Sequence, residues 1–183
     1  VSTDGSKSTT VKGAGFPKFT NDSKYCIFQS GSKVCILSLG SWKLDSSTVA
    51  DQFVLPDDGS EQWLALKIGN GFILKNLKTA KQLNFPKAAS ISFNPVGTHV
   101  ATKFADHTKL FELTSGKETM LSKENVNHLK FDSDGRQLAY TTGTDSAVVL
   151  HYYRIGSTEP IVKVNSRQLM AGGYLDAYDF NFN

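Results

Sequence analysis

The residues best suited to acid–base or metal chemistry are four histidines, and they form no recognisable motif. They are His99, His107, His128 and His151. A zinc site needs histidines or cysteines at short, characteristic spacings, and none of the four has such a neighbour in the sequence. We interpret them as structural or surface residues. We therefore predict no metal site, no cofactor and no catalytic residue.

Paired carboxylates are the second feature that could do chemistry, either in acid–base catalysis or in a calcium loop. The pairs are Asp57 with Asp58, and Asp132 with Asp134. Each pair lies in a predicted turn that leads into an apolar strand. Aspartate is common in such turns because its side chain hydrogen-bonds the local backbone. We interpret both pairs as turn residues.

The sequence motifs of three large enzyme classes are missing. There is no G-x-S-x-G nucleophile elbow and no G-x-x-x-x-G-K-S/T phosphate loop. The Gly13-Ala14-Gly15 segment lacks the third glycine and the following helix of a dinucleotide-binding fingerprint. We predict a protein that is not an enzyme.

A lysine-rich stretch is the strongest candidate for binding a partner. The net charge is only +3, but no acidic residue occurs between Gln62 and Ala105. Its lysines include Lys75, Lys78, Lys81 and Lys87. They form either a solvated rim or a docking surface for an acidic protein or for RNA phosphates. Lysine lacks the bidentate contacts of arginine, which argues against recognition of specific bases.

Large aromatic residues supply further candidates. Trp63 lies on a predicted strand and is expected in the core, whereas Trp42 follows a strand into an acidic loop. Tyr153 precedes Arg154, and strand alternation sends only one of the two adjacent tyrosines outward. We predict that Trp42, Tyr153 and Arg154 contact a partner, together with the four lysines.

The composition is that of an ordinary globular protein, with 39% apolar and 20% charged residues in a chain of 183. The two cysteines, Cys26 and Cys35, are expected as free thiols buried on neighbouring strands. No apolar run approaches the roughly 18 residues of a membrane span, and residues 1–10 lack the apolar middle of a signal peptide. We expect an intracellular protein, in the cytoplasm or the nucleus.

The elements that must position these residues come from an internal repeat of about 37 residues. Phe19, Phe93 and Phe131 each precede a turn and an apolar strand, and a degraded copy begins near Pro56. Short strands with turn signals at this period predict an all-β fold of β-propeller blades, each with four antiparallel strands. We expect about four to five blades, in repeats near 11–50, 51–86, 87–123 and 124–165 and a partial copy at 166–183, after a flexible segment at 1–10.

Several short motifs carry a family resemblance. Phe93 and Phe131 each stand four residues before a glycine, a turn aspartate follows (Asp106 and Asp145), and Ser115-Gly116 ends a later strand. These repeats resemble the WD40 family of β-propellers over residues 11–183. No Trp-Asp dipeptide is present, so the resemblance implies the architecture and not the family's internal hydrogen-bond network.

Members of that family mostly act as rigid platforms that gather partners. The resemblance therefore implies a non-catalytic scaffold for protein–protein interaction in a multi-subunit intracellular complex. Because closed propellers usually have four to eight blades, either the chain is a fragment or a partner supplies further blades. Two alternatives stay open: the propeller of a hydrolase or TolB-like protein, which residues 137–142 also resemble, and an RNA-associated propeller that uses the lysine-rich rim.

Overall fold

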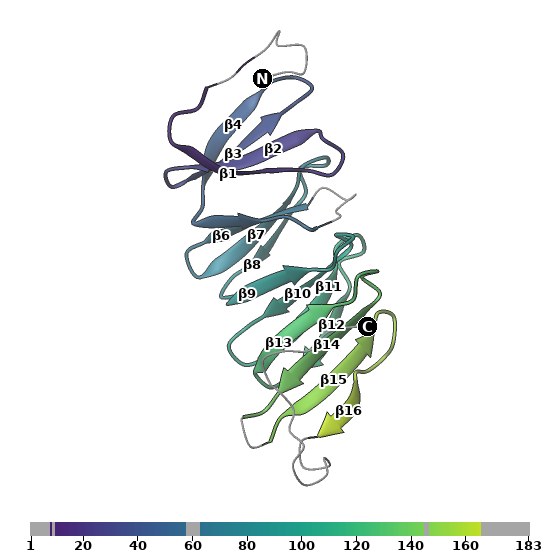
Figure 1. Cartoon of the computed structure of the whole chain (residues 1–183). Coiled ribbons are helices and arrows are strands. Elements are labelled where there is room, and N and C mark those ends of the chain that lie inside the picture. The colour runs from purple at the N-terminus through teal and green to yellow at the C-terminus, as the bar shows by residue number, and fades with distance from the viewer. Residues whose placement is uncertain (1–7, 9, 58–62, 145–146, 166–183) are drawn as a thin grey trace.

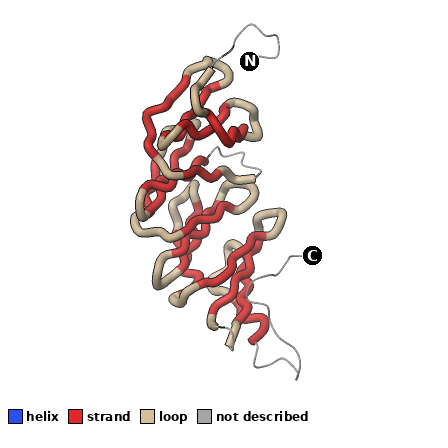
Figure 2. The backbone as a smooth tube through the Cα atoms, turned by 60° about the vertical axis from the view of Figure 1, so that its left-hand side comes forward, coloured by secondary structure: helices blue, strands red, loops and turns tan. Residues whose placement is uncertain are grey.

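The computed structural model describes residues 8, 10–57, 63–144 and 147–165. Over these residues it contains sixteen β-strands and no helix (Figure 2). The predicted all-β class is confirmed. Within the same residues there is accordingly no helix that could span a membrane. The predicted flexible segment at 1–10 and the partial copy at 166–183 fall almost entirely outside the described residues, as does Asp145.

Each group of four consecutive strands forms one antiparallel sheet. The first sheet comprises β1 (Ala14–Phe19), β2 (Tyr25–Ser30), β3 (Lys33–Ser38) and β4 (Leu44–Val49). The second comprises β5 (Gln52–Val54), β6 (Trp63–Ile68), β7 (Gly71–Asn76) and β8 (Gln82–Phe85). The third comprises β9 (Ser90–Phe93), β10 (His99–Lys103), β11 (Thr108–Glu112) and β12 (Glu118–Ser122). The fourth comprises β13 (Val126–Phe131), β14 (Gln137–Thr142), β15 (Val149–Arg154) and β16 (Ile161–Asn165).

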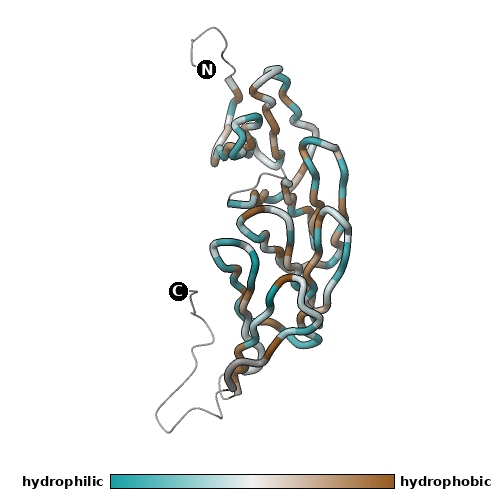
Figure 3. The backbone as a smooth tube through the Cα atoms, turned by 90° about the vertical axis from the view of Figure 1, so that its right-hand side faces the viewer, coloured by the Kyte–Doolittle hydropathy of each residue, from teal (hydrophilic) through white to brown (hydrophobic). Residues whose placement is uncertain are grey.

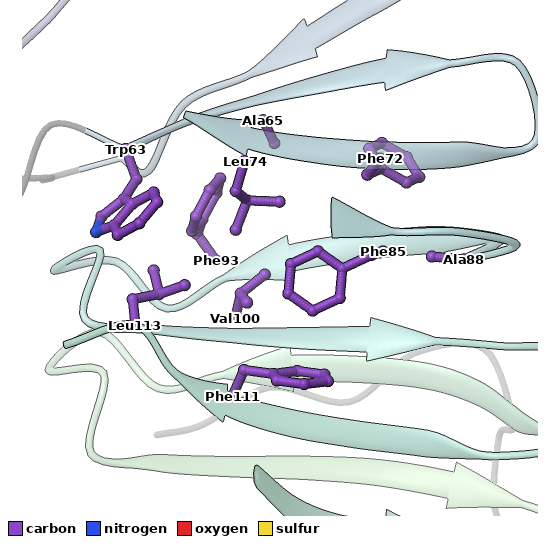
Figure 4. Close-up of a cluster of buried hydrophobic side chains, with 10 residues drawn as sticks. All are labelled: Trp63, Ala65, Phe72, Leu74, Phe85, Ala88, Phe93, Val100, Phe111 and Leu113. Atoms are coloured by element: carbon purple, nitrogen blue, oxygen red, sulfur yellow. The ribbon is translucent and has the colours of Figure 1, made fainter. Parts of the chain in front are cut away.

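The four sheets stack in chain order into a bowed column, with the first and the fourth sheets at opposite ends (Figures 1 and 3). Apolar side chains fill the space between successive sheets. Between the second and third sheets, Trp63, Phe72 and Leu74 lie opposite Phe93 and Val100 (Figure 4). This arrangement buries the apolar faces of neighbouring sheets against each other.

Strand β6 shows why the central strands of the inner sheets have several apolar residues in a row. Leu64 and Leu66 pack toward the first sheet, and Trp63 and Ala65 pack toward the third. Successive residues of a strand point to opposite faces, and both faces of this sheet are covered. The strand is therefore apolar at four consecutive positions, from Trp63 to Leu66, rather than at alternate ones. The prediction that Trp63 lies in the core is confirmed.

The repeat offset noted in the sequence is a strand register in the structure. Phe19 pairs with Cys26, Phe93 with Val100, and Phe131 with Leu138, always between the first and second strands of a sheet. The residue after each phenylalanine closes the intervening turn. In the fourth sheet it is Asp132, whose Oδ1 accepts the amides of Arg136 and Gln137 at 2.8 and 2.9 Å. Asp132 is thus a turn residue, as its sequence context predicts.

Polar side chains cross all three junctions between successive sheets and donate to backbone carbonyls, with two such bonds between the third and fourth sheets. The four bonds are Tyr25 Oη to Leu77 (3.0 Å), Lys81 Nζ to Leu113 (3.4 Å), Asn94 Nδ2 to Gly135 (3.0 Å) and Tyr140 Oη to Leu121 (2.5 Å). They satisfy carbonyl groups at the sheet junctions. They also fix how each sheet sits on the next.

One strand begins later than the sequence predicts. We expected a strand from Ala147 to Tyr153, but β15 begins at Val149. The amide of Ala147 donates to the carbonyl oxygen of Thr144 at 2.8 Å, so Ala147 is bonded outside the sheet and is not part of the strand. Gly143 lies at φ +91°, and a Cβ there would stand 2.1 Å from the Ala147 oxygen. The close approach at this turn requires glycine.

Candidate interaction surfaces

A groove of about 690 Å³ lies between the first and second sheets. Lys75, one of the predicted partner-binding residues, lines it from β7, and its Nζ lies 3.5 Å from Asp45 Oδ2 on β4. The other basic residues of the lining are Lys33 and Lys43, both exposed. Asp45 is the single carboxylate among the described residues of the lining. The groove therefore favours an acidic occupant.

The floor of this groove is partly apolar. Ile36, Leu44 and Leu77 supply aliphatic surface, and Tyr25 and Asn76 supply polar groups. Asn76 Oδ1 accepts the amides of Lys78 and Thr79 at 3.0 and 2.8 Å, which fixes the turn between β7 and β8. A mixed floor with basic sides can hold an extended peptide segment that carries acidic and apolar side chains.

The four predicted lysines do not form one surface. The exposed Lys78 lies in the turn beside the groove, near Lys75. Lys81 Nζ instead donates to Leu113 and bridges the second and third sheets. Lys87 lies at the opposite edge of the second sheet, at φ +64° and beside Lys67. Lysine content alone could not show this separation. Lys78 lies in the turn between β7 and β8, whereas Lys87 follows the far end of β8.

Trp42 lies at the outer face of the first sheet, which is the face turned away from the second sheet. It packs on a cluster of Cys26, Phe28, Cys35 and Leu37. Its φ of +58° is matched at the same turn position by Ala80 (+59°) in the second sheet and by Gly116 (+77°) in the third. A side chain in this conformation costs about 1 kcal/mol or more. The fold thus holds a large aromatic group where glycine would fit better.

Strand β1 of the first sheet exposes two phenylalanines, and the pairing of Phe19 with Cys26 places Phe19 on the outer face. Phe16 is 81% exposed and Phe19 is 62% exposed. The equivalent Phe93 and Phe131 are only 9% and 8% exposed, because the preceding sheet packs on each of them. A cavity of about 210 Å³ opens on the same face, lined by Val11, Ala14, Gly15, Pro17, Cys26, Phe28 and Leu37. This face has the character of a sheet–sheet interface.

Cys26 and Cys35 are free thiols buried in that face, as predicted. They lie on the adjacent strands β2 and β3. Burial raises the pKa of both thiols. They therefore act as small apolar groups rather than as nucleophiles.

Tyr153 is not on the surface, and its predicted role as an exposed anchor is wrong. The side chain is 2% exposed, pairs with Leu138 and faces the third sheet. Its hydroxyl donates to the Ser157 carbonyl at 2.8 Å. Strand alternation instead turns Tyr152 the other way, where its hydroxyl donates to Gln137 Oε1. Arg154 is exposed, and partner binding by Trp42, Arg154 and the lysines stays a prediction.

The histidines do not come together in the described part of the chain. No three His, Cys, Asp or Glu residues among the described residues are placed to hold a metal ion. His151 stacks on Tyr140 with ring centroids 4.7 Å apart, and its Nε2 lies 2.8 Å from Thr142 Oγ1. Burial lowers the pKa of His151, against a weaker opposing effect of Glu124. This environment keeps the ring neutral and packed.

Several solved structures superpose on this stack of sheets. The Myceliophteria thermophila Cps50 (Swd1) β-propeller domain superposes with a TM-score of 0.54 at 15% identity, over 92% of this chain and 59% of that one. The chain is a β-propeller segment. A eukaryotic initiation factor gives a TM-score of 0.65 at 10% identity, over 86% of this chain and 44% of that one. Kuenenia stuttgartiensis hydrazine synthase gives 0.50 at 13% identity, over 90% and 52%.

These similarities establish the fold and nothing further, since all the identities are low. The chain spans about half the length of each of these structures. No family model matches the sequence, and no curated protein matches it.

Sequence reasoning missed four residues of these surfaces: Lys33 and Lys43 in the groove, Phe19 on the outer face, and the exposed Phe16 on the same strand as Phe19. Phe19 was visible as the start of a repeat. Its exposure was not, because the register that buries Phe93 and Phe131 needs a preceding sheet. Lys33 and Lys43 join Lys75 only through the pairing of β3 with β4 and the packing of the first sheet on the second.

Proposed function

We propose that this protein is a non-catalytic scaffold that binds other protein subunits in a multi-subunit assembly inside the cell. The observation that carries the proposal is the outer face of the first sheet, where Phe19 is exposed above a cluster of apolar side chains. Large contiguous apolar surface at a sheet face is a feature of protein–protein interfaces. The two buried free thiols support a reducing compartment.

The chemistry of that face specifies the kind of partner. At the junctions between the second and third sheets and between the third and fourth sheets, the residue equivalent to Phe19 packs on the face of another four-stranded sheet. The outer face also has a cavity beside Phe19, lined in part by the buried Phe28 and Leu37. A blade of the same type, presented by a partner subunit, would bury Phe19 as the second and third sheets bury Phe93 and Phe131. The groove between the first and second sheets offers a second contact, for an acidic segment.

A photo-crosslinking experiment in the native assembly tests this proposal. Benzoylphenylalanine replaces Phe19 in one variant and, as the control, Met120 in another. Met120 is also exposed, at 41%, but lies on β12 away from the outer face. We expect the Phe19 variant to crosslink to a β-sheet segment of another protein chain and the Met120 variant not to do so. Crosslinks from position 19 that are confined to its own chain would contradict the proposal.

A further inference from the structure

A cavity of about 240 Å³ lies between the third and fourth sheets. It is at the edge of the stack where β9, β11 and β13 begin. The polar side chains of its lining are Ser90, Ser92, Lys103, Thr108, Asn127 and His128. This edge is separate from the groove and from the outer face described above.

One wall is a row of donors across three strands. Lys103 pairs with Ser90 of β9 on one side and with Thr108 of β11 on the other. Residues paired in register share a face of the sheet, so these three side chains stand next to one another. Ala101 and Ser92 form the next row on that face. Ala101 packs against the fourth sheet, which identifies the face, and its small side chain leaves room for the cavity.

Two groups of this wall lack the partners that buried or charged groups normally have. Thr108 is 1% exposed, and its Oγ1 has no hydrogen-bond partner in the described part of the chain. An unpaired buried hydroxyl is destabilising, and in native proteins it usually has a reason. The Lys103 ammonium forms no ion pair with a described residue. No carboxylate occurs among the residues that line the cavity.

The opposite wall is a local irregularity of β13. The register of β13 on β14 shifts between Val126 and Leu129, so Asn127 and His128 lie in a bulge. Bulges redirect side chains and are common beside binding sites. Asn127 Nδ2 donates to the Gly143 carbonyl oxygen at 2.7 Å, which holds the bulge in place. The irregular segment therefore lines the cavity directly opposite the row of donors.

We propose that this cavity binds a phosphate group. A phosphate has several oxygen atoms that accept hydrogen bonds around a tetrahedron, and the cavity lining combines the hydroxyls of Ser90, Ser92 and Thr108 with the Lys103 ammonium. Lysine binds phosphate as a point charge, whereas planar carboxylates are typically held by the fork of arginine. The volume lies below the roughly 300–1,000 Å³ of sites for larger ligands. It suits a free phosphate ion or the phosphate of a small monoester.

Calorimetric titration of the full chain at low ionic strength tests the proposal, with inorganic phosphate in one arm and O-phosphoserine in the other. Sodium chloride at matched ionic strength is the blank. We expect saturable binding in at least one arm. Tighter binding of phosphoserine would assign the site to an ester, and tighter binding of inorganic phosphate would assign it to the free ion. The absence of binding in both arms would overturn the proposal.

Two isosteric variants separate binding from stability. Thr108→Val removes the unpaired hydroxyl of the cavity. Thr102→Val removes another unpaired hydroxyl, which is also buried but faces the second sheet, on the side of Val100. We expect Thr108→Val and Lys103→Met to weaken phosphate binding about tenfold, and Thr102→Val to leave it unchanged. Both threonine variants should unfold at a temperature no lower than the wild type. Equal affinity of Thr108→Val and Thr102→Val would contradict the site.

Discussion

Asn94 Nδ2 donates to the carbonyl oxygen of Gly135 at 3.0 Å and so joins a turn of the third sheet to the equivalent turn of the fourth. Asn94 is fully buried. Its Oδ1 accepts the amides of Thr98 and His99 at 2.9 and 2.8 Å. One side chain therefore closes its own turn and connects two sheets.

Asn94→Ala should lower the free energy of unfolding by about 2–3 kcal/mol, because three backbone groups lose their partner. Asp132→Ala is the matched control, since Asp132 closes the equivalent turn through two amides. Urea unfolding should show a loss for Asn94→Ala that exceeds the loss for Asp132→Ala by about 1 kcal/mol. Equal losses would show that the bond to Gly135 contributes nothing.

Gly135→Ala should be more destabilising than an alanine at another glycine of similar backbone conformation. Gly135 has a φ of +67°, and a Cβ there would lie 2.8 Å from Asn94 Nδ2. Gly116 has a φ of +77° with nothing within 4 Å of a Cβ. Gly116→Ala should cost about 1 kcal/mol through the backbone alone, and Gly135→Ala about 2–3 kcal/mol because it also displaces Asn94. Thermal unfolding of the two variants makes the comparison, and a smaller loss at Gly135 would exclude the steric effect.

Ala80→Gly should stabilise the protein by about 0.5 kcal/mol, which is the strain released less the extra entropy of the unfolded chain. Ala80 is exposed and has a φ of +59° in the turn between β7 and β8. Ala89 is also exposed but does not have a positive φ, so Ala89→Gly should destabilise by a similar amount. Chemical denaturation would measure the change in the free energy of unfolding for both variants, which should be positive for Ala80→Gly and negative for Ala89→Gly. Destabilisation by Ala80→Gly would mean that the turn is not strained.

The groove between the first and second sheets should bind an acidic peptide through Lys33 and Lys43. Fluorescence anisotropy with a labelled oligoglutamate peptide at low salt measures the affinity. The double variant Lys33→Glu, Lys43→Glu should weaken binding about tenfold. Lys117→Glu, Lys123→Glu makes the same change in net charge at exposed positions outside the groove. A similar loss in both double variants would show that only net charge matters.

Stability should fall as the pH is lowered from 6.5 toward 5, because two half-buried histidines resist protonation. Burial lowers the pKa of His99 and of His151 from 6.5, and Glu112 and Glu124 oppose this effect. The unfolded chain then binds more protons than the folded chain in this window, so the free energy of unfolding rises with pH. The contribution of the two neutral histidines to stability is fully present above pH 6.5. His99→Gln, His151→Gln should flatten the dependence in urea titrations at several pH values. An unchanged slope would exclude these two residues as its source.

The fold was predictable because the residues that recur in each repeat are the ones that strand pairing brings together in the core. Phe93 and Phe131 stand seven residues before Val100 and Leu138, and the structure pairs each phenylalanine with that residue. Turn residues such as Asp132 are also local, since the carboxylate bonds amides only four and five residues away. Such features depend on short stretches of chain and are visible in the sequence.

The candidate surfaces were less predictable because they depend on which sheet faces which. Alternation shows that Tyr152 and Tyr153 point in opposite directions, but only the position of the third sheet decides that Tyr153 is the buried one. Lys81 reads as a surface lysine until Leu113 of the next sheet accepts its hydrogen bond. Lys33, Lys43 and Lys75 become neighbours only through the packing of the first sheet on the second.

Every strand pairing lies within one sheet, and each sheet is a single contiguous stretch of chain. The described sheets therefore communicate only through their packed faces and a few side-chain bonds, as the units of a one-dimensional array do. Cooperativity in such an array passes from neighbour to neighbour. The second and third sheets are covered on both faces and should therefore form the folding nucleus. The first sheet should become fully rigid only when a binding partner packs against Phe19.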